Sequence, residues 1–295
     1  MKIGLVLGGG GGKGAYELGV WKALTELGIN KYINFFSGTS IGAFNAALFA
    51  QENIEIAEEL WKEVSLEKLI PLNKLEILKK GIGLIIGGKN LNLSKKYLSQ
   101  KAEEGSVSKE GAIELIDKYI DIKKIKSSGK ICYATCTELP DFKVKYFNLS
   151  EYDENIGRDI IIASSSLPLI YEPTEVNNIK YMDGALCDNL PVQPLYGEGC
   201  NIIIVVSLSR ENRVNRALYP KTKIIEIYSK NLNENVINGT LNLDEEAKKN
   251  RIKEGYLDTM DILLPIIEMT KYIVKVDEEE KNPFLYKVYK GISKK

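Results

Sequence analysis

The sequence predicts an α/β fold with a mostly parallel central sheet. The chain opens with a short apolar run, Ile3–Leu7, which suits a buried strand and leads directly into a cluster of glycines. A helical pattern follows the glycines, and a second strand, loop and helix repeat the same order. Two strand–loop–helix units in succession are typical of a parallel sheet, because parallel strands need a crossover connection.

Each unit is supported by its own pattern. In the first, Gly28 stands where a glycine ends a helix, and the helix before it is indicated by apolar residues at helical spacing: Ala15, Leu18, Trp21, Leu24 and Leu27. In the second, the strand Ile33–Ser37 runs through a short loop into a helix of small residues, Ala43–Ala50. Later apolar runs are predicted to be further buried strands: Ile131–Thr135, Lys143–Phe147, Ile202–Ser207 and Ile224–Tyr228.

The remaining segments indicate one domain with additions. Between Leu66 and Lys130, short helical patterns broken by glycines predict a helical cap inserted over the sheet and not a separate domain. A charged helix is expected from about Asp244 to Leu257, followed by a mixed tail. We therefore expect a single domain over residues 1–295, with the cap insertion at about 66–130 and a variable C-terminal tail from about 261.

Composition excludes several classes of function. The 40 basic and 40 acidic side chains balance, whereas a nucleic-acid-binding protein needs a basic surplus to displace counterions. The chain has no histidine, which excludes Ser-His-Asp and Cys-His catalysis and imidazole metal sites. The cysteines lack the spacing of a disulfide framework or of a zinc site: Cys132, Cys136, Cys187 and Cys200. Neither a signal peptide nor a run of about 18 apolar residues is found, so we expect a cytoplasmic location.

The glycine cluster fits two nucleotide-binding patterns incompletely. Gly9, Gly11 and Gly14 match G-x-G-x-x-G after a strand, but a dinucleotide site needs an acidic residue where the second strand ends, and Ser37 stands there. A phosphate-binding P-loop is excluded because Lys13 is followed by glycine and not by serine or threonine. The loop still offers backbone N–H groups at a helix N-terminus to an anion, either a phosphate or an oxyanion.

A second motif, Gly38-Thr39-Ser40-Ile41-Gly42, indicates a nucleophile. It is G-x-S-x-G between a predicted strand and a helix, the arrangement that holds a serine hydroxyl above the edge of a sheet. The alternative is a tight glycine turn with a bystander serine. Because the motif lies one unit after a glycine loop, we expect Ser40 to be the nucleophile.

A serine nucleophile needs a base, and without histidine the candidates are carboxylates. Asp183, in Tyr181-Met182-Asp183-Gly184-Ala185, ends a short extended stretch before a glycine that permits a tight turn. Asp188 is the rival, but the run Asp188–Pro191 is more typical of a cap or turn. We expect Asp183 to be the base.

Four blocks of the sequence, in this order, resemble the patatin-like phospholipases. They are Gly9–Gly14, Gly38–Gly42, the run Ala163–Pro168 that is similar to the family's A-S-x-x-x-P, and Asp183–Pro191, which is similar to its D-G-x-x-x-D-N-x-P. Two departures are mild: Gly8 stands where plant members carry an aspartate, and Ala185 replaces a frequent glycine. The resemblance covers residues 1 to about 260.

The resemblance implies a three-layer α/β/α lipid acyl hydrolase that cleaves phospholipid or lysophospholipid esters through a serine–aspartate dyad. Ser40 would be the nucleophile and Asp183 its base, with an oxyanion hole formed by the amides of Gly9, Gly10 and Gly11. Lys13 and Gly14 would support the loop, although a solvent-facing Lys13 is the alternative. No cofactor or metal is expected, and no carboxylate cluster with calcium-loop spacing is present.

The predicted cap carries a basic stretch. From Lys68 to Lys101 there are eight lysines against a single acid, Glu76, and they surround the apolar run Ile82–Ile86. Basic charge beside an apolar segment is how peripheral proteins bind anionic membranes, so a membrane contact is one hypothesis for this stretch. The alternative is a lysine-rich, solvated cap.

Three other functions stay open at this point. A serine acyltransferase would use the same dyad with a second alcohol in place of water. A non-catalytic lipid-binding relative would not need both Ser40 and Asp183, and a dinucleotide-binding protein would need the missing strand-end acid.

Overall fold

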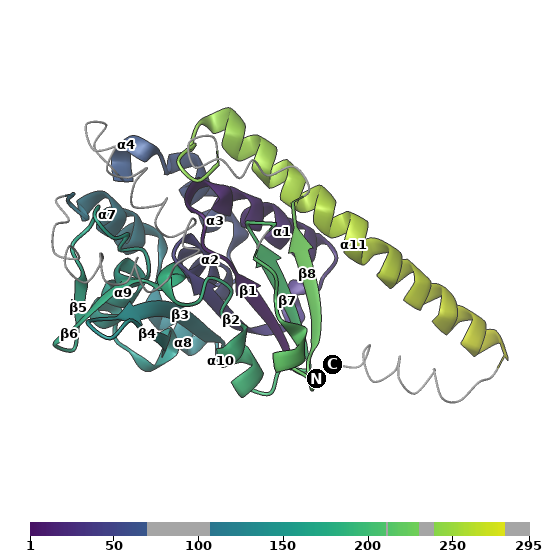
Figure 1. Cartoon of the computed structure of the whole chain (residues 1–295). Helices are drawn as coiled ribbons and strands as arrows, with labels where there is room; N and C mark the ends of the chain where they lie inside the picture. Colours follow the sequence, from purple (N-terminus) through teal and green to yellow (C-terminus); the bar gives the residue numbers. More distant parts are fainter. Residues whose placement is uncertain (70–106, 211, 230–238, 281–295) are drawn as a thin grey trace.

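The computed structural model describes residues 1–69, 107–210, 212–229 and 239–280, the last five without their side chains (Figure 1). Most of the basic stretch Lys68–Lys101, and with it much of the predicted cap, lies outside the described residues. The parts of the cap that are described are the short helices α4 (Leu66–Leu69), α7 (Glu110–Tyr119) and α8 (Ile122–Ser127).

Within the described residues the fold is built on an eight-stranded sheet in the order β5-β6-β3-β2-β1-β7-β8, with β4 paired to β3. Neighbours from β3 through β2, β1 and β7 to β8 are parallel, whereas β4, β5 and β6 pair antiparallel. The strands are β1 (Ile3–Leu7), β2 (Ile33–Thr39), β3 (Ile131–Glu138), β4 (Lys143–Asn148), β5 (Thr174–Val176), β6 (Ile179–Asp183), β7 (Ile202–Ser207) and β8 (Lys223–Tyr228). The predicted α/β fold with a mostly parallel sheet is confirmed.

Helices cover both faces of this sheet. Side chains alternate along β1, so Leu5 and Leu7 face a large core while Val6 faces a smaller one. Among the described elements, one short helix, α10 (Val192–Gly197), covers the smaller core. The large core is formed with α7, α8 and with α1 (Ala15–Glu26), α2 (Ile41–Ala50), α3 (Ile54–Glu63) and α9 (Glu154–Ser164). The result is three layers, one of them thin.

The longest helix, α11 (Glu245–Glu280), packs along α1 and then extends beyond the body of the molecule (Figure 1). The two helices approach closely at Gly19 and Gly255, where an added Cβ would collide with the backbone of the opposite helix. The predicted end of this helix near Leu257 is wrong. Although Pro265 cannot donate a backbone hydrogen bond, the helix continues through it and through the predicted start of the tail.

The sheet differs from the sequence prediction at its margin. Lys143–Phe147 was expected to be a buried strand, but among the described strands β4 pairs only with β3, and most of its side chains are exposed or partly exposed. The reason is its position at an edge, where lysines alternate with less polar residues and remain in solvent. The strand β5, which has three residues, was not predicted separately.

Strand β3 brings two distant parts of the chain together. Its first half pairs with β2, ending with Thr39 opposite Thr135. Its next residue, Cys136, lies opposite Asp183 at the end of β6. The residue after Thr39 and the last residue of β6 therefore meet at the carboxyl end of the parallel strands, where α/β folds place their sites.

Candidate active site

Ser40 occupies a sharp turn between β2 and α2. Its backbone has a φ of 55°, an uncommon and strained conformation for a residue with a side chain. The turn needs glycine at Gly42, because an added Cβ there would collide with the Leu7 carbonyl of β1. The G-x-S-x-G motif therefore forms the elbow that the sequence predicts.

The side chains of Ser40 and Asp183 are in direct contact. The Ser40 hydroxyl donates to Asp183 Oδ2 at 2.7 Å, and Asp183 Oδ1 accepts from the Ala185 N–H at 2.9 Å. Asp183 is fully buried, and this burial raises its pKa from 3.8 to about 6, although the hydrogen bonds from Ala185 and Ser40 act in the opposite direction. A carboxylate with this pKa is mostly ionised at neutral pH, and its conjugate acid is far weaker than that of a free aspartate.

Asp188 makes the contacts of a turn residue. One carboxylate oxygen accepts from the Tyr146 hydroxyl at 2.7 Å and the other from the Leu190 N–H at 3.1 Å. Its backbone carbonyl accepts from the Thr39 hydroxyl at 2.9 Å. Asp188 thus holds the loop after β6 against the end of β2 and does not contact the Ser40 hydroxyl.

Ser164 holds the backbone of the elbow at Ser40. Its hydroxyl accepts from the Ser40 N–H at 3.0 Å and donates to the Thr135 carbonyl at 2.7 Å. Ser164 belongs to the block Ala163–Pro168 of the family resemblance, but no role for it was predicted from the sequence. The signal in the sequence was its place before Pro168 in that block. Its hydrogen-bond partner, Ser40, lies 124 residues away in the chain and is revealed only by the fold.

The glycine loop runs beside Ser40 with two of its amides open. The Gly9 N–H donates to Asn189 Oδ1 at 3.1 Å, and the Asn189 amide donates back to the Gly9 carbonyl at 3.2 Å. The Gly12 N–H donates to the Thr240 carbonyl at 2.8 Å. Within the described part of the chain no acceptor is found for the N–H of Gly10 or Gly11. Of the three amides expected in an oxyanion hole, that of Gly9 is therefore already engaged.

Two cations hold this loop in place. Lys13 is only 4% exposed and its ammonium donates to the Leu208 carbonyl at 3.4 Å, so the solvent-facing alternative is wrong. Arg251 of α11 was not singled out from the sequence. Its guanidinium donates to the carbonyls of Gly12 and Gly239, each at 2.9 Å, and also to that of Asn242. The C-terminal helix thus fixes the loop at the start of the chain.

Gly14 and the first turn of α1 connect the loop to the elbow helix. Asn45 of α2 donates to the Gly14 carbonyl at 3.1 Å and to Glu17 Oε2 at 2.7 Å, and it accepts from the Trp61 indole at 3.0 Å. Glu17 is fully buried, which raises its pKa well above the usual value. The loop and the elbow therefore belong to one hydrogen-bonded unit.

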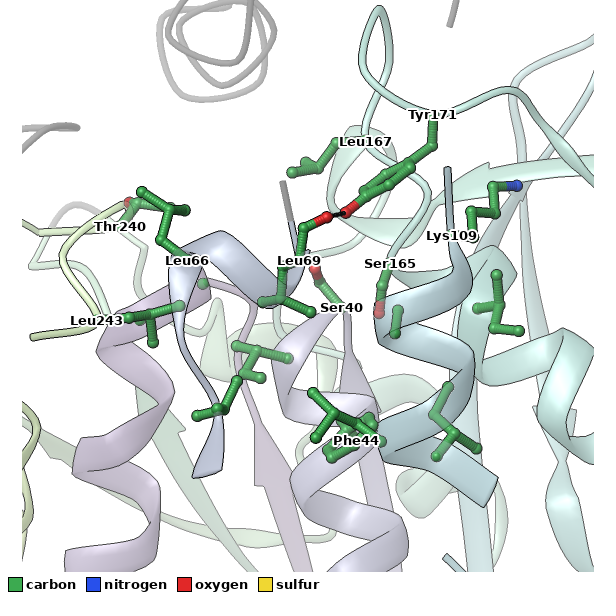
Figure 2. Close-up of a pocket in the computed structure, with 18 of the residues that line it drawn as sticks. Ser40, Phe44, Leu66, Leu69, Lys109, Ser165, Leu167, Tyr171, Thr240 and Leu243 are labelled. Carbon is green, nitrogen blue, oxygen red and sulfur yellow. Dashed lines mark hydrogen bonds between the residues drawn. The ribbon is translucent and has the colours of Figure 1, made fainter. Parts of the chain in front are cut away.

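An apolar cavity of about 130 Å3 opens beside Ser40 (Figure 2). The Tyr171 hydroxyl donates to the Leu69 carbonyl at 2.8 Å, and this pair crosses the cavity above Ser40 in the figure. Its walls come from several helices and from the segment before α11: Ile41, Phe44, Leu60, Trp61, Leu66, Leu115, Ile116, Leu241 and Leu243. A cavity with such walls suits a hydrocarbon chain.

Neither a metal centre nor a membrane span is found in what the structure describes. No group of three or more cysteine, aspartate or glutamate side chains in these residues could hold a metal ion. None of the described helices has the length and hydropathy to cross a membrane. The four cysteines are free thiols, and Cys136 is buried directly beside Asp183.

Comparison with known proteins identifies a family that matches most of this chain. The sequence model of the patatin-like phospholipase family matches residues 5–196. Lysophospholipase NTE1 from Candida glabrata is 30% identical over 215 residues, which is 70% of this chain and 10% of that protein. The Saccharomyces cerevisiae lysophospholipase NTE1 is 28% identical over 215 residues, 70% of this chain and 11% of that protein. This chain thus spans about a tenth of the length of these relatives.

Among solved structures, VipD from Legionella pneumophila has a similar fold. It superposes with a TM-score of 0.55 at 18% identity, over 89% of this chain and 66% of that one. The family match ends at 196, so Arg251 and the cavity wall formed by Leu241 and Leu243 lie beyond it.

Proposed function

The chain belongs to the patatin-like phospholipase family, and from that membership we propose that it hydrolyses acyl esters of lipids, either phospholipids or lysophospholipids. The observation that carries the proposal is the hydrogen bond of 2.7 Å from the Ser40 hydroxyl, which lines an apolar cavity, to the buried Asp183. The relatives named lysophospholipase support the same substrate class.

The reaction would proceed through an acyl-enzyme. Ser40 Oγ attacks the ester carbonyl carbon while Asp183 Oδ2 accepts the hydroxyl proton, and the resulting tetrahedral centre carries an oxyanion. Asp183 then returns the proton to the departing alcohol. Water, deprotonated by the same carboxylate, attacks the acyl-enzyme and releases the fatty acid, which restores Ser40. One carboxylate thus performs both proton transfers that a histidine performs in a triad.

The open N–H groups of Gly10 and Gly11 are suited to the oxyanion. Each such donor contributes about 3 kcal/mol to transition-state stabilisation in related acyl-transfer sites. Asn189 and Arg251 would keep these amides in place, because they bind the Gly9 amide and the Gly12 carbonyl of the same loop. Lys13, which belongs to the loop, would anchor it to the Leu208 carbonyl. The acyl chain would occupy the apolar cavity.

The test is a comparison of wild type with Ser40→Ala. We expect the variant to lose hydrolysis of a lysophospholipid and to fold normally, and an organophosphonate should label wild type at Ser40 alone. Ser127→Ala, which changes an exposed hydroxyl on α8, is the matched control. Full activity in Ser40→Ala, or labelling at another serine, would exclude the proposed nucleophile. Mass spectrometry of the products with added glycerol separates hydrolysis from acyl transfer to a second alcohol.

A further inference from the structure

Lys109 is an unusual member of the cavity beside Ser40. It precedes α7, and among the described residues that line this cavity it is the one with a charged side chain. It also lines a second, outer pocket of about 430 Å3, together with Glu110 and Glu172. Lys109 therefore stands between an apolar cavity suited to an acyl chain and a polar pocket beyond it.

The charge of Lys109 is poorly compensated. Its ammonium donates to the Thr174 hydroxyl at 2.7 Å, and within the described part of the chain it forms no ion pair. Burial lowers its pKa to about 8, while the negative charges of Glu172 and Asp159 act in the opposite direction. A half-buried cation without a direct ion pair is stabilised when a ligand places a negative charge within hydrogen-bond distance.

The position of Lys109 is tied to that of the dyad. The Thr174 hydroxyl that it contacts lies 2.9 Å from the Ser166 hydroxyl, and the Ser166 carbonyl accepts from the Asp183 N–H at 3.0 Å. A short chain of hydrogen bonds thus fixes the spacing between the ammonium and the base. Fixed spacing between a reacting group and a binding group is what selection of one substrate geometry requires.

We propose that Lys109 binds the phosphate of the lipid head group while the acyl chain fills the apolar cavity, and that it makes the enzyme selective for lipids with a singly charged phosphodiester. This inference rests on the proposed function. The carboxylates of Glu110 and Glu172 in the outer pocket disfavour a second negative charge, so a phosphate monoester would bind less well than a diester.

The kinetic test uses three lipids with the same acyl chain. They are a lysophosphatidylglycerol (a phosphodiester), a lysophosphatidic acid (a monoester) and a monoacylglycerol, which has no phosphate. We expect wild type to prefer the diester, and Lys109→Met to raise KM for it about tenfold, as loss of one charge-assisted hydrogen bond would. We expect kcat for the diester, and both constants for the monoacylglycerol, to change by less than about twofold.

Two further variants sharpen the test. Lys126→Met removes an exposed lysine of α8 outside both pockets and should leave all three substrates unchanged. Lys109→Arg should keep the preference for the diester. In wild type this preference should decline as pH rises through about 8, where Lys109 loses its proton, and in Lys109→Arg it should not, because arginine remains charged. The charged groups that face Lys109 are Glu110, Glu172 and Asp159.

Direct binding separates this inference from the proposed function. An ether-linked lysophosphatidylglycerol, which cannot be hydrolysed, should bind Ser40→Ala about tenfold more tightly than Ser40→Ala/Lys109→Met by calorimetry. If wild type hydrolyses none of the three lipids, the proposed function fails and the binding measurement still tests Lys109. Equal losses on all three lipids in Lys109→Met would overturn the inference. It would also be overturned if the variant only relieved inhibition by free fatty acid, since Lys109 would then bind a carboxylate.

Discussion

The Ser164 hydroxyl accepts a hydrogen bond from the Ser40 N–H at 3.0 Å and so holds the backbone of the proposed nucleophile. Ser40 has a φ of 55°, and strained backbone of this kind costs about 1–3 kcal/mol, so the surrounding contacts must maintain it. Because Ser164 also donates to Thr135 of β3, the elbow is anchored to the sheet.

We therefore predict that Ser164→Ala lowers kcat about tenfold and leaves KM nearly unchanged, since the acyl cavity is not altered. The Ser40 N–H would lose its acceptor, and the free energy of unfolding should fall by about 1–3 kcal/mol. Steady-state kinetics and thermal unfolding measure the two effects. Ser128→Ala, which removes a hydroxyl bonded within α8, is the control. An unchanged kcat would mean that the elbow keeps its conformation without Ser164.

Asp183 and Asp188 should respond differently to the same isosteric change. Asp183→Asn cannot accept the serine proton, so we expect at least a thousandfold loss of kcat, on the scale of removing a general base. Asp188→Asn should keep kcat within a few-fold and lose about 1 kcal/mol of stability, because its bond with Tyr146 is weakened. The reverse pair of phenotypes would assign the base to Asp188.

Asp183→Asn should also be more stable than wild type at neutral pH. Burial raises the pKa of Asp183 from 3.8 to about 6, so the folded protein keeps a proton that the unfolded chain releases, and stability is lost as pH rises through this window. Ionised Asp183 thus costs the folded state about 3 kcal/mol at pH 7. Thermal unfolding should show a gain in the variant at pH 7 that shrinks towards pH 4. No gain at pH 7 would mean that the buried charge is compensated.

The same pKa predicts the pH dependence of activity. The base must be ionised to accept the serine proton, so kcat/KM should rise with pH through about 6 and then level off. Since the chain has no histidine, an imidazole cannot produce this change. The profile of kcat/KM on a short-chain ester, measured for wild type and Asp188→Asn, should be the same in both. A shift of the midpoint in Asp188→Asn would attribute the titration to that residue.

The elements that were predicted correctly from the sequence are those whose signals are local. The strand Ile3–Leu7, the elbow Gly38–Gly42 and the turn after Asp183 each carry their own pattern. By contrast, the engagement of the Gly9 amide depends on Asn189, 180 residues further along the chain. The role of Ser164 likewise depends on the register of β3. Such contacts are set by tertiary packing, which no local pattern encodes.

The role of Arg251 in the C-terminal region also depends on tertiary packing and could not be predicted from a local pattern. From the sequence it belongs to a charged helix, where an arginine is usually solvated, but α11 buries it against the glycine loop. We predict that Arg251→Lys lowers kcat about tenfold, because one ammonium cannot satisfy carbonyls that a guanidinium reaches in two directions. Lys249→Arg, on an exposed position of the same helix, is the control. Equal kcat in Arg251→Lys and wild type would mean that the glycine loop does not need the Arg251 contacts to keep its position.

The last prediction concerns Glu17, which lies beneath the loop and contacts neither Ser40 nor Asp183 in the described structure. Its Oε2 accepts from Asn45 at 2.7 Å, whereas no partner for Oε1 is found within the described residues. Burial raises its pKa well above the usual value, so the folded state favours the protonated form. The unfolded chain releases that proton above the ordinary pKa of a glutamate, and stability is therefore lost as pH rises from that value towards the folded pKa.

Glu17→Gln is neutral at every pH and nearly the same shape. We expect it to unfold at a higher temperature than wild type at pH 8, with a smaller difference at pH 5. Glu114→Gln, an exposed residue of α7, should show no such pH-dependent gain. If Glu17→Gln is less stable than wild type at both pH values, the carboxylate is ionised in the folded protein and has a partner that supports it.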